Sequence, residues 1–318
     1  MIRCALLLLL LGTVPASAEI LSFVSYTPVS ERPLLTRTYA NEPVTISGTL
    51  ALPTRASPYE QSGKLPAVIL MHGTGGILPD REPAWARRFN EWGIAAFYVD
   101  SFTARGITPP LYSNSPGYIA SVAHIVDAWR AFQALARDPR IDRNRVAVMG
   151  FSRGGEVSLA TMFDRFRLGS VDDPSPRFAG HIALYPYCAF QYRGKDVTRA
   201  PLLMLLGGAD DMDNPVACQH QAEWLKTRTS VKVVVWPGAN HDFDRSIRLT
   251  YDPKMIGIRD CEAQYDVDTL VIHWRDGEPF RTADWLAKCR YQGAHVGGDA
   301  AALSGSIEEI RRFLAAVF

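Results

Sequence analysis

The sequence predicts an α/β fold: a doubly wound, mostly parallel sheet of about eight strands with helices on both faces. Short apolar runs of strand length alternate along the chain with longer amphipathic stretches of helical period. Several of these runs, such as residues 67–71 and 146–149, are apolar throughout, which is typical of parallel strands that are covered on both faces. The chain has 318 residues, of which 47% are hydrophobic, so it can bury one large core. We therefore expect a single domain.

The predicted elements follow one another in a regular order. Two strands come first, and strands and helices then alternate up to a last helix at the C-terminus. The predicted strands are 20–26, 44–52, 67–71, 94–100, a run from residue 146, 179–185, 201–206 and 231–236. The predicted helices before the last one are 83–92, 116–136, 156–166 and 217–227. Sheets of this kind bind their ligands at the carboxyl ends of the strands.

The motif G-F-S-R-G directly follows the apolar run that begins at Val146. It places Ser152 in a G-x-S-x-G pattern between a strand and the small residues that open a helix. This is the pattern of a nucleophile elbow, a sharp turn whose strain pushes the serine hydroxyl out of the sheet. Side chains at Gly150 or Gly154 would collide with the neighbouring chain. The sequence therefore predicts Ser152 as a catalytic nucleophile.

A serine nucleophile needs a base, because its hydroxyl is protonated at neutral pH. The strand predicted at 231–236 runs into P-G-A-N-H, which offers His241 as the base. The strand predicted at 201–206 runs into G-G-A-D-D, which offers Asp210 or Asp211 to fix the imidazole tautomer. Nucleophile, acid and histidine are expected in this order, on loops after successive strands.

The negative charge that develops on the substrate needs hydrogen-bond donors. One is normally the N–H after the nucleophile, and the second comes from an upstream loop. The strand predicted at 67–71 ends in H-G-T-G-G, whose glycines allow a close approach to substrate. We therefore expect the backbones of Arg153 and Thr74 to form an oxyanion hole.

Together these motifs resemble those of the dienelactone hydrolase-like family of α/β-hydrolases. The resemblance covers most of the chain from about residue 44 to residue 241 and resumes in the last helix. Its motifs are V-I-L-M-H-G-T-G-G, Y-V-D-S-F-T-A-R-G, R-V-A-V-M-G-F-S-R-G-G, L-L-G-G-A-D-D and W-P-G-A-N-H-D-F-D. The resemblance implies the α/β-hydrolase fold, hydrolysis of small carboxylic esters or lactones, and neither a cofactor nor a metal. Members that hydrolyse dienelactone itself carry a cysteine nucleophile, so Ser152 favours a general serine-esterase chemistry.

The resemblance also bears on the choice of acid. Counted from Gly207, Asp210 occupies the acid position of the family's G-x-x-D-D pattern, whereas counting back from Pro215 favours Asp211. Asp213 lies further past the strand end and is expected to cap the next helix. Adjacent residues that leave a strand point in different directions, so only one of the first two carboxylates can reach the imidazole. We expect Asp210 to be the acid.

The N-terminus has the pattern of a secretory signal peptide. Arg3 is followed by an apolar run to Leu11 and by small residues up to Ala18. We expect cleavage before Glu19, which would leave residues 19–318 as one catalytic domain, secreted or periplasmic. No other stretch is long enough to span a bilayer. An uncleaved N-terminal anchor is the alternative.

Charge gives no indication of a polyanionic partner. Cleavage would remove one charged residue, Arg3, and take the formal net charge from +1 to 0. We therefore expect neither nucleic acid nor a charged membrane surface as a partner. The expected partner is a small ester or lactone substrate, and the oligomeric state stays open.

Four cysteines remain after the expected cleavage. An even number in an oxidising compartment predicts two disulfides, with three connectivities open and four free thiols as the alternative. Cys188 and Cys218 fall at neighbouring strand ends, and Cys261 and Cys289 fall within one segment. These two pairs are therefore favoured.

Two features can be interpreted in two ways each. Residues 245–300 are less regular in pattern and follow the catalytic histidine, so they form either a cap over the substrate pocket or an extra layer of core. Arg105, after the strand predicted at 94–100, either binds a substrate carboxylate or makes a structural ion pair with Asp100 or another acid.

The predicted function is that of a serine hydrolase acting on a small carboxylic ester or lactone through an acyl-enzyme. A peptidase or an acyltransferase would use the same three residues. A non-catalytic binding protein on this fold normally lacks one of them, and none of the three is missing here.

Overall fold

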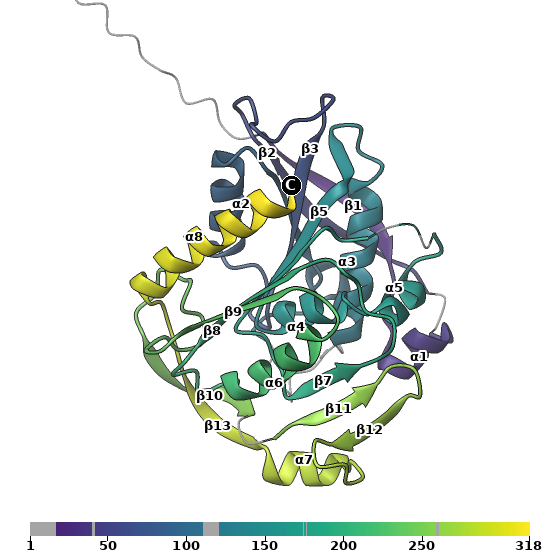
Figure 1. The fold of residues 1–318 in the computed structure, drawn as a ribbon, viewed down its shortest axis with the longest axis vertical. Helices are drawn as coiled ribbons and strands as arrows, with labels where there is room; N and C mark the ends of the chain where they lie inside the picture. Colours follow the sequence, from purple (N-terminus) through teal and green to yellow (C-terminus); the bar gives the residue numbers. More distant parts are fainter. Residues whose placement is uncertain (1–16, 40–41, 111–120, 174, 176, 259–260) are drawn as a thin grey trace, which may run out of the picture.

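The computed structural model describes residues 17–39, 42–110, 121–173, 175, 177–258 and 261–318. Its main feature is an eight-stranded sheet in the order β1-β2-β4-β3-β5-β6-β8-β9 (Figure 1). These strands are β1 (Ser17–Ser25), β2 (Val44–Leu52), β3 (Leu65–Met71), β4 (Ala95–Asp100), β5 (Ile141–Phe151), β6 (His181–Leu184), β8 (Leu202–Gly207) and β9 (Val231–Trp236). The pairs β1–β2 and β2–β4 are antiparallel and the others are parallel. The predicted fold class is confirmed.

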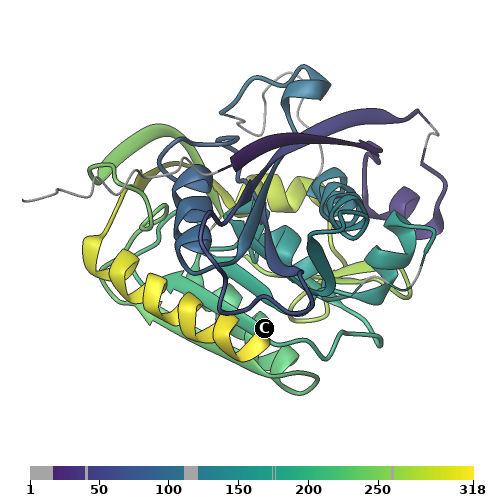
Figure 2. The same ribbon diagram turned by 90° about the horizontal axis from the view of Figure 1, so that it is seen from above.

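Helices cover both faces of this sheet. One face carries α2 (Glu82–Glu91) and α8 (Ala300–Val317), and α8 runs along one flank of the sheet in Figure 2. The other face carries α3 (Ser121–Leu135), α4 (Arg153–Ala160), α5 (Asp164–Ser170) and α6 (Pro215–Lys226). In β3, Val68 and Leu70 pack in the core under α2 and α8, whereas Ile69 and Met71 pack in the core on the opposite face. The strand is apolar throughout because its two faces are both buried.

The helix predicted at 156–166 is two helices, α4 and α5. Thr161 follows α4 and donates its hydroxyl to the carbonyl oxygen of Ser158 at 2.8 Å. Phe163 pairs with Val197 in an isolated antiparallel bridge, which needs extended backbone and therefore interrupts the helix. The first part of the helix predicted at 116–136 lies outside the described residues, which resume at Ser121. The expected signal peptide also lies outside them, apart from the first two residues of β1.

The prediction of an irregular segment at 245–300 is wrong for most of its length. The segment contains β10 (Thr250–Ile258), β11 (Ala263–Asp266), β12 (Val271–Trp274), α7 (Thr282–Lys288) and β13 (Arg290–Val296). β10 and β13 form an antiparallel ribbon, and β11 and β12 join β7 (Phe190–Arg193) in a small sheet. Two short helices, α1 (Glu31–Thr36) and η1 (Thr103–Arg105), complete the described elements. Figure 1 shows the ribbon and the small sheet at one end of the molecule.

Candidate active site

Ser152 lies on a tight turn between the end of β5 and the start of α4. Its backbone has a φ of 53° and a ψ of −118°, a strained conformation for a residue with a side chain. Two glycines make this turn possible. A Cβ on Gly150 would lie 1.8 Å from the carbonyl oxygen of Gly154, and a Cβ on Gly154 would lie 1.9 Å from that of Met71. The G-x-S-x-G motif therefore has the geometry expected of an elbow.

The H-G-T-G-G loop after β3 lies against this turn. A Cβ on Gly73 would be only 3.2 Å from the Cβ of Ser152. The buried imidazole of His72 holds the loop, with Nδ1 2.7 Å from the carbonyl oxygen of Gly73 and Nε2 3.2 Å from the backbone N of Ser101. Since Nε2 accepts the Ser101 N–H, Nδ1 carries the proton and donates to Gly73. Burial lowers the pKa of His72, which favours the neutral ring that this arrangement requires.

The two N–H groups expected in the oxyanion hole belong to two different segments, the start of α4 and the loop after β3. Arg153 is the first residue of α4, where helix N–H groups lack intrahelical partners and the helix dipole is positive. Thr74 directly follows Gly73 in the loop beside the serine. The fold thus brings both backbone segments to the serine turn.

Asp210 is the carboxylate that contacts His241. Its Oδ1 accepts the backbone N–H groups of Met212 and Asp213 at 2.9 and 3.0 Å, and its Oδ2 lies 2.8 Å from Nδ1 of the imidazole. Asp211 points elsewhere and binds His295 through both the backbone N and Nδ1, each at 2.8 Å. Of the two candidates from the sequence, only Asp210 is hydrogen-bonded to the imidazole in the described residues.

His241 is buried beside the end of β6, the strand that also contacts Ser152. Its ring packs edge-on against Tyr185, with the ring centroids 4.7 Å apart. The carbonyl oxygen of Leu184, the residue before Tyr185, accepts the backbone N–H of Ser152 at 3.0 Å. Burial alone would lower the pKa of His241, but the neighbouring carboxylates, Asp210 foremost, outweigh burial and raise it to about 9.

Asp213 is not the helix cap that the sequence predicts. The N-cap of α6 is Asn214, whose side chain accepts the N–H of Val216 at 2.9 Å. The carboxylate of Asp213 is buried, and its Oδ2 lies 3.9 Å from Nδ1 of His241. The sequence shows a third aspartate in this turn, but its distance from the imidazole depends on how the turn folds.

The β10–β13 ribbon contacts, from outside the main sheet, the loop after β8 that carries Asp210 and the loop after β9 that carries His241. Ile258 of β10 donates its N–H to the carbonyl oxygen of Met212 at 2.8 Å. His295 of β13 binds Asp211, and Gly297, just after β13, donates its N–H to the carbonyl oxygen of His241 at 2.9 Å. The segment at 245–300 therefore supports the acid and histidine loops.

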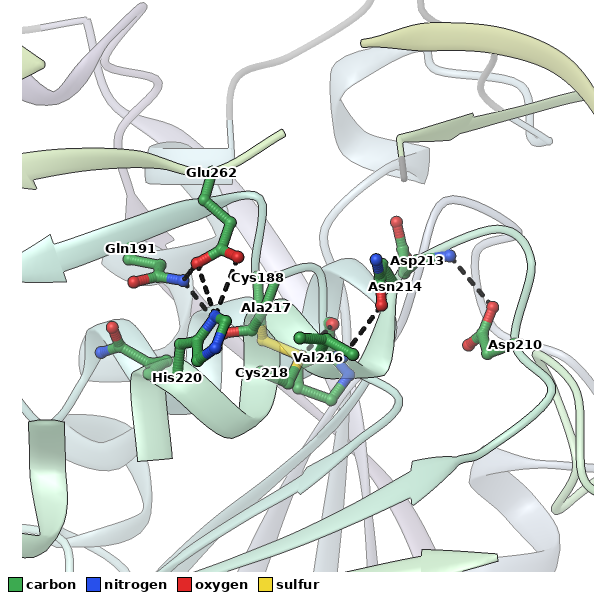
Figure 3. The surroundings of a disulfide bond; sticks show 12 residues. Cys188, Gln191, Asp210, Asp213, Asn214, Val216, Ala217, Cys218, His220 and Glu262 are labelled. Atoms are coloured by element: carbon green, nitrogen blue, oxygen red, sulfur yellow. Dashed lines mark hydrogen bonds and ion pairs between the residues drawn. A yellow bond between two sulfur atoms is a disulfide. The ribbon is translucent and has the colours of Figure 1, made fainter. Parts of the chain in front are cut away.

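Disulfides join the two favoured cysteine pairs. Cys188, three residues after Tyr185, is bonded to Cys218 in α6, and Cys261 is bonded to Cys289. The predicted pairing is confirmed. Figure 3 shows the first disulfide, which joins Cys188 to Cys218 in α6, the helix that begins just after the turn carrying Asp210 and Asp213.

Arg105, for which the sequence left substrate binding and a structural ion pair open, makes a structural ion pair. Its guanidinium makes a bidentate ion pair with Asp127 at 2.8 and 3.0 Å. Its remaining N–H groups donate to the carbonyl oxygens of Ser101 and Tyr26 and to the hydroxyl of Thr27. These contacts use all five donors of the buried guanidinium, so none remains for a substrate carboxylate. The structural alternative holds, with Asp127 rather than Asp100 as the partner.

Sequence reasoning did not find the polar network behind His241. Asp244 accepts the hydroxyl of Tyr185 at 2.5 Å and the indole N–H of Trp85 at 2.7 Å. Asp242 accepts from Arg81 at 3.1 Å and from Arg245 at 3.2 Å. The alternating aspartates of H-D-F-D were the available signal, but apart from Arg245 their partners lie far away in the chain.

No helix within the described part of the chain is long and apolar enough to cross a membrane. Within the described ranges, no group of three or more His, Cys, Asp or Glu side chains is arranged to hold a metal ion.

The eight-stranded sheet, its helical layers and a serine turn at the carboxyl end of β5 define a protein of the α/β-hydrolase fold. The profile of the dienelactone hydrolase family matches residues 48–257, which is more than half of the chain. The chain belongs to this family, as its motifs predict.

The known proteins that are similar to it include a bacterial sequence relative and a solved bacterial structure. The quorum-quenching protein AidA of Acinetobacter baumannii is 30% identical over 133 residues, which are 41% of this chain and 42% of AidA, so the match spans less than half of that relative. The structure of a provisionally assigned dienelactone hydrolase from Klebsiella pneumoniae superposes with a TM-score of 0.54 at 15% identity. That superposition covers 93% of this chain and 99% of the other, and at this identity the likeness concerns the fold alone.

Proposed function

We propose that the protein is a serine hydrolase that cleaves a small carboxylic ester or lactone with Ser152, His241 and Asp210 as its triad. One observation carries the proposal: a strained serine turn after β5 lies at the same edge of the main sheet as a buried imidazole–carboxylate pair after β8 and β9, with 2.8 Å between Nδ1 and Oδ2. This combination is what a weak hydroxyl nucleophile needs for activation.

The chemistry follows from the proton positions. The neutral imidazole of His241 is the active form. Its Nδ1 donates to Asp210, and its Nε2 then carries the lone pair that takes the proton from Ser152 Oγ. Oγ then attacks the carbonyl carbon, and the N–H groups of Arg153 and Thr74 stabilise the oxyanion. The imidazolium protonates the leaving alcohol, which in a lactone stays attached to the acyl group. A water deprotonated by His241 then attacks the acyl-enzyme and releases the acid.

The substrate class calls for a panel rather than a single compound. Short-chain, aromatic and carboxylate-bearing esters should be compared with lactones, and esters with amides, because peptidases and acyltransferases use the same triad. One relative is named a quorum-quenching protein, so the panel should include ester and lactone signalling compounds of bacteria.

We also propose that the protein is secreted or periplasmic after cleavage before Glu19. The two disulfides support an oxidising compartment. Cleavage would leave residues 19–25 of β1 paired with β2, since their partners run from Leu50 to Val44.

Ser152→Ala tests the proposed function. It should lower kcat by about 10⁴ or more, because only the oxyanion donors and substrate binding would remain. Ser158→Ala is the matched control, since it removes a buried hydroxyl from the same helix whose Oγ has no hydrogen-bond partner among the described residues. A fluorophosphonate probe should label Ser152 in the control and nothing in the Ser152 variant. Near-full activity of folded Ser152→Ala would overturn the proposal.

A further inference from the structure

His241 faces a second buried carboxylate besides its hydrogen-bonded partner. Oδ2 of Asp213 lies 3.9 Å from Nδ1, against 2.8 Å for Oδ2 of Asp210. The side chain of Asp213 is 8% exposed. Helix α6 does not need this carboxylate, because Asn214 caps it. Burying an aspartate costs free energy, so its place beside the imidazole calls for another explanation.

The two carboxylates belong to one hydrogen-bonded turn. The N–H of Asp213 donates to Oδ1 of Asp210 at 3.0 Å, which Figure 3 shows as a dashed line between the two residues. The turn therefore holds both side chains at the same edge of the imidazole. A shift of about 1 Å would bring Asp213 within hydrogen-bond distance of Nδ1.

The charges around Asp213 come from three elements. His241, from the loop after β9, favours its ionised form, whereas Asp210 and Glu156 of α4 oppose it. Burial is the largest influence and raises the pKa of Asp213 to about 7. The ionised form of this carboxyl is therefore favoured more strongly when the imidazole is cationic than when it is neutral.

We propose that Asp213 is a second positioning carboxylate for His241, which stabilises the imidazolium together with Asp210 and takes over the Nδ1 hydrogen bond when Asp210 cannot make it. This inference rests on the proposed function, because it matters only if His241 is the base. It assigns a role to an aspartate that lies outside the triad.

A double-mutant cycle on kcat tests the inference. Asp210→Asn alone should cost about 10², because Asp213 remains, and Asp210→Asn/Asp213→Asn should cost about 10⁴, the loss expected when an imidazole has no carboxylate. Asp213→Asn alone should cost less than about tenfold in kcat with KM nearly unchanged. Asp210→Asn/Asp211→Asn is the matched control and should behave like Asp210→Asn, since Asp211 binds His295.

Two further measurements separate positioning from a merely structural role. Asp213→Asn should move the acid limb of the kcat/KM profile to lower pH, because losing a nearby negative charge lowers the pKa of His241. In Asp210→Asn, the Nδ1 proton of His241 should keep a downfield NMR resonance, which adding Asp213→Asn removes.

The inference fails if the loss of kcat in Asp210→Asn/Asp213→Asn equals the product of the losses in the two single variants. It also fails if the acid limb of the kcat/KM profile does not move in Asp213→Asn, or if the Nδ1 resonance of His241 is absent in Asp210→Asn. If the double variant does not fold, the pH profile of Asp213→Asn and the Nδ1 resonance of Asp210→Asn, both measured on single variants, decide the matter. Activity of Ser152→Ala would instead overturn the proposed function, so the two failures are distinguishable.

Discussion

The serine side and the histidine side of the candidate site are held in place by different means. On the serine side, β3 and β5 are neighbours in the sheet, with Met71 paired to Gly150, and backbone contacts at two glycines fix the turn at Ser152. On the histidine side, the loops after β8 and β9 are held from outside the sheet by the β10–β13 ribbon and by a disulfide in α6.

The two sides differ in the sequence separation between the residues that hold them in place. The serine turn rests on steric contacts within a short motif and one adjacent strand. The acid loop depends on Asp211 meeting His295, which is 84 residues away. A change on the serine side should therefore act through packing, whereas a change on the histidine side should act through weaker, distributed contacts.

The largest effect is expected from Gly154→Ala. The new methyl group would meet the carbonyl oxygen of Met71 at 1.9 Å, so α4 would have to move away from β3. We expect a loss of about 4 kcal/mol or more in the free energy of unfolding, together with loss of activity. Gly238→Ala on the histidine side is the control, because a Cβ there meets nothing within 4 Å. Denaturant unfolding measures both, and a stable, active Gly154→Ala would show that the turn does not depend on this contact.

The second largest effect is expected from Arg105→Gln. It removes the partner of the buried Asp127 and leaves that charge uncompensated, which costs about 3–5 kcal/mol. Any loss of kcat/KM should be equal for neutral and carboxylate-bearing esters. Arg312→Gln, in an exposed ion pair, should change stability by less than about 1 kcal/mol. A loss confined to carboxylate-bearing esters would return Arg105 to a role in substrate binding.

Cys188→Ser/Cys218→Ser should cost about 2–4 kcal/mol of stability and should also lower kcat. The activity falls because the helix that follows the acid turn loses its link to the strand end beside Tyr185. Cys261→Ser/Cys289→Ser, which opens the other disulfide, should lower stability similarly with a smaller change in kcat. Thermal unfolding and steady-state kinetics compare the two pairs, and equal activity losses would contradict the proposed role of the first disulfide.

The smallest effect is expected from Asp211→Asn. It weakens one partly exposed contact with His295, so stability should fall by about 1 kcal/mol and kcat by less than about threefold. A loss of kcat as large as that of Asp210→Asn would transfer the role of acid to Asp211.

Local patterns in the sequence determined the main sheet and the serine turn. The predicted strands at 44–52 and 231–236 coincide with β2 and β9, because β-branched and apolar residues at strand length favour extended backbone. The Gly150 and Gly154 contacts are equally local, since the motif itself brings the colliding atoms together. The cysteine pairing followed from the order of strand ends.

Only the tertiary structure decided which charged groups meet. Arg105 pairs with Asp127 of α3, α4 stops where Phe163 meets Val197, and the ribbon of residues 250–296 reaches the acid loop. Asp213 lies beside His241 rather than capping a helix. Hydrophobic periodicity tells whether a residue is buried, whereas an ion pair or an isolated bridge depends on two segments whose separation in the chain leaves no periodic trace.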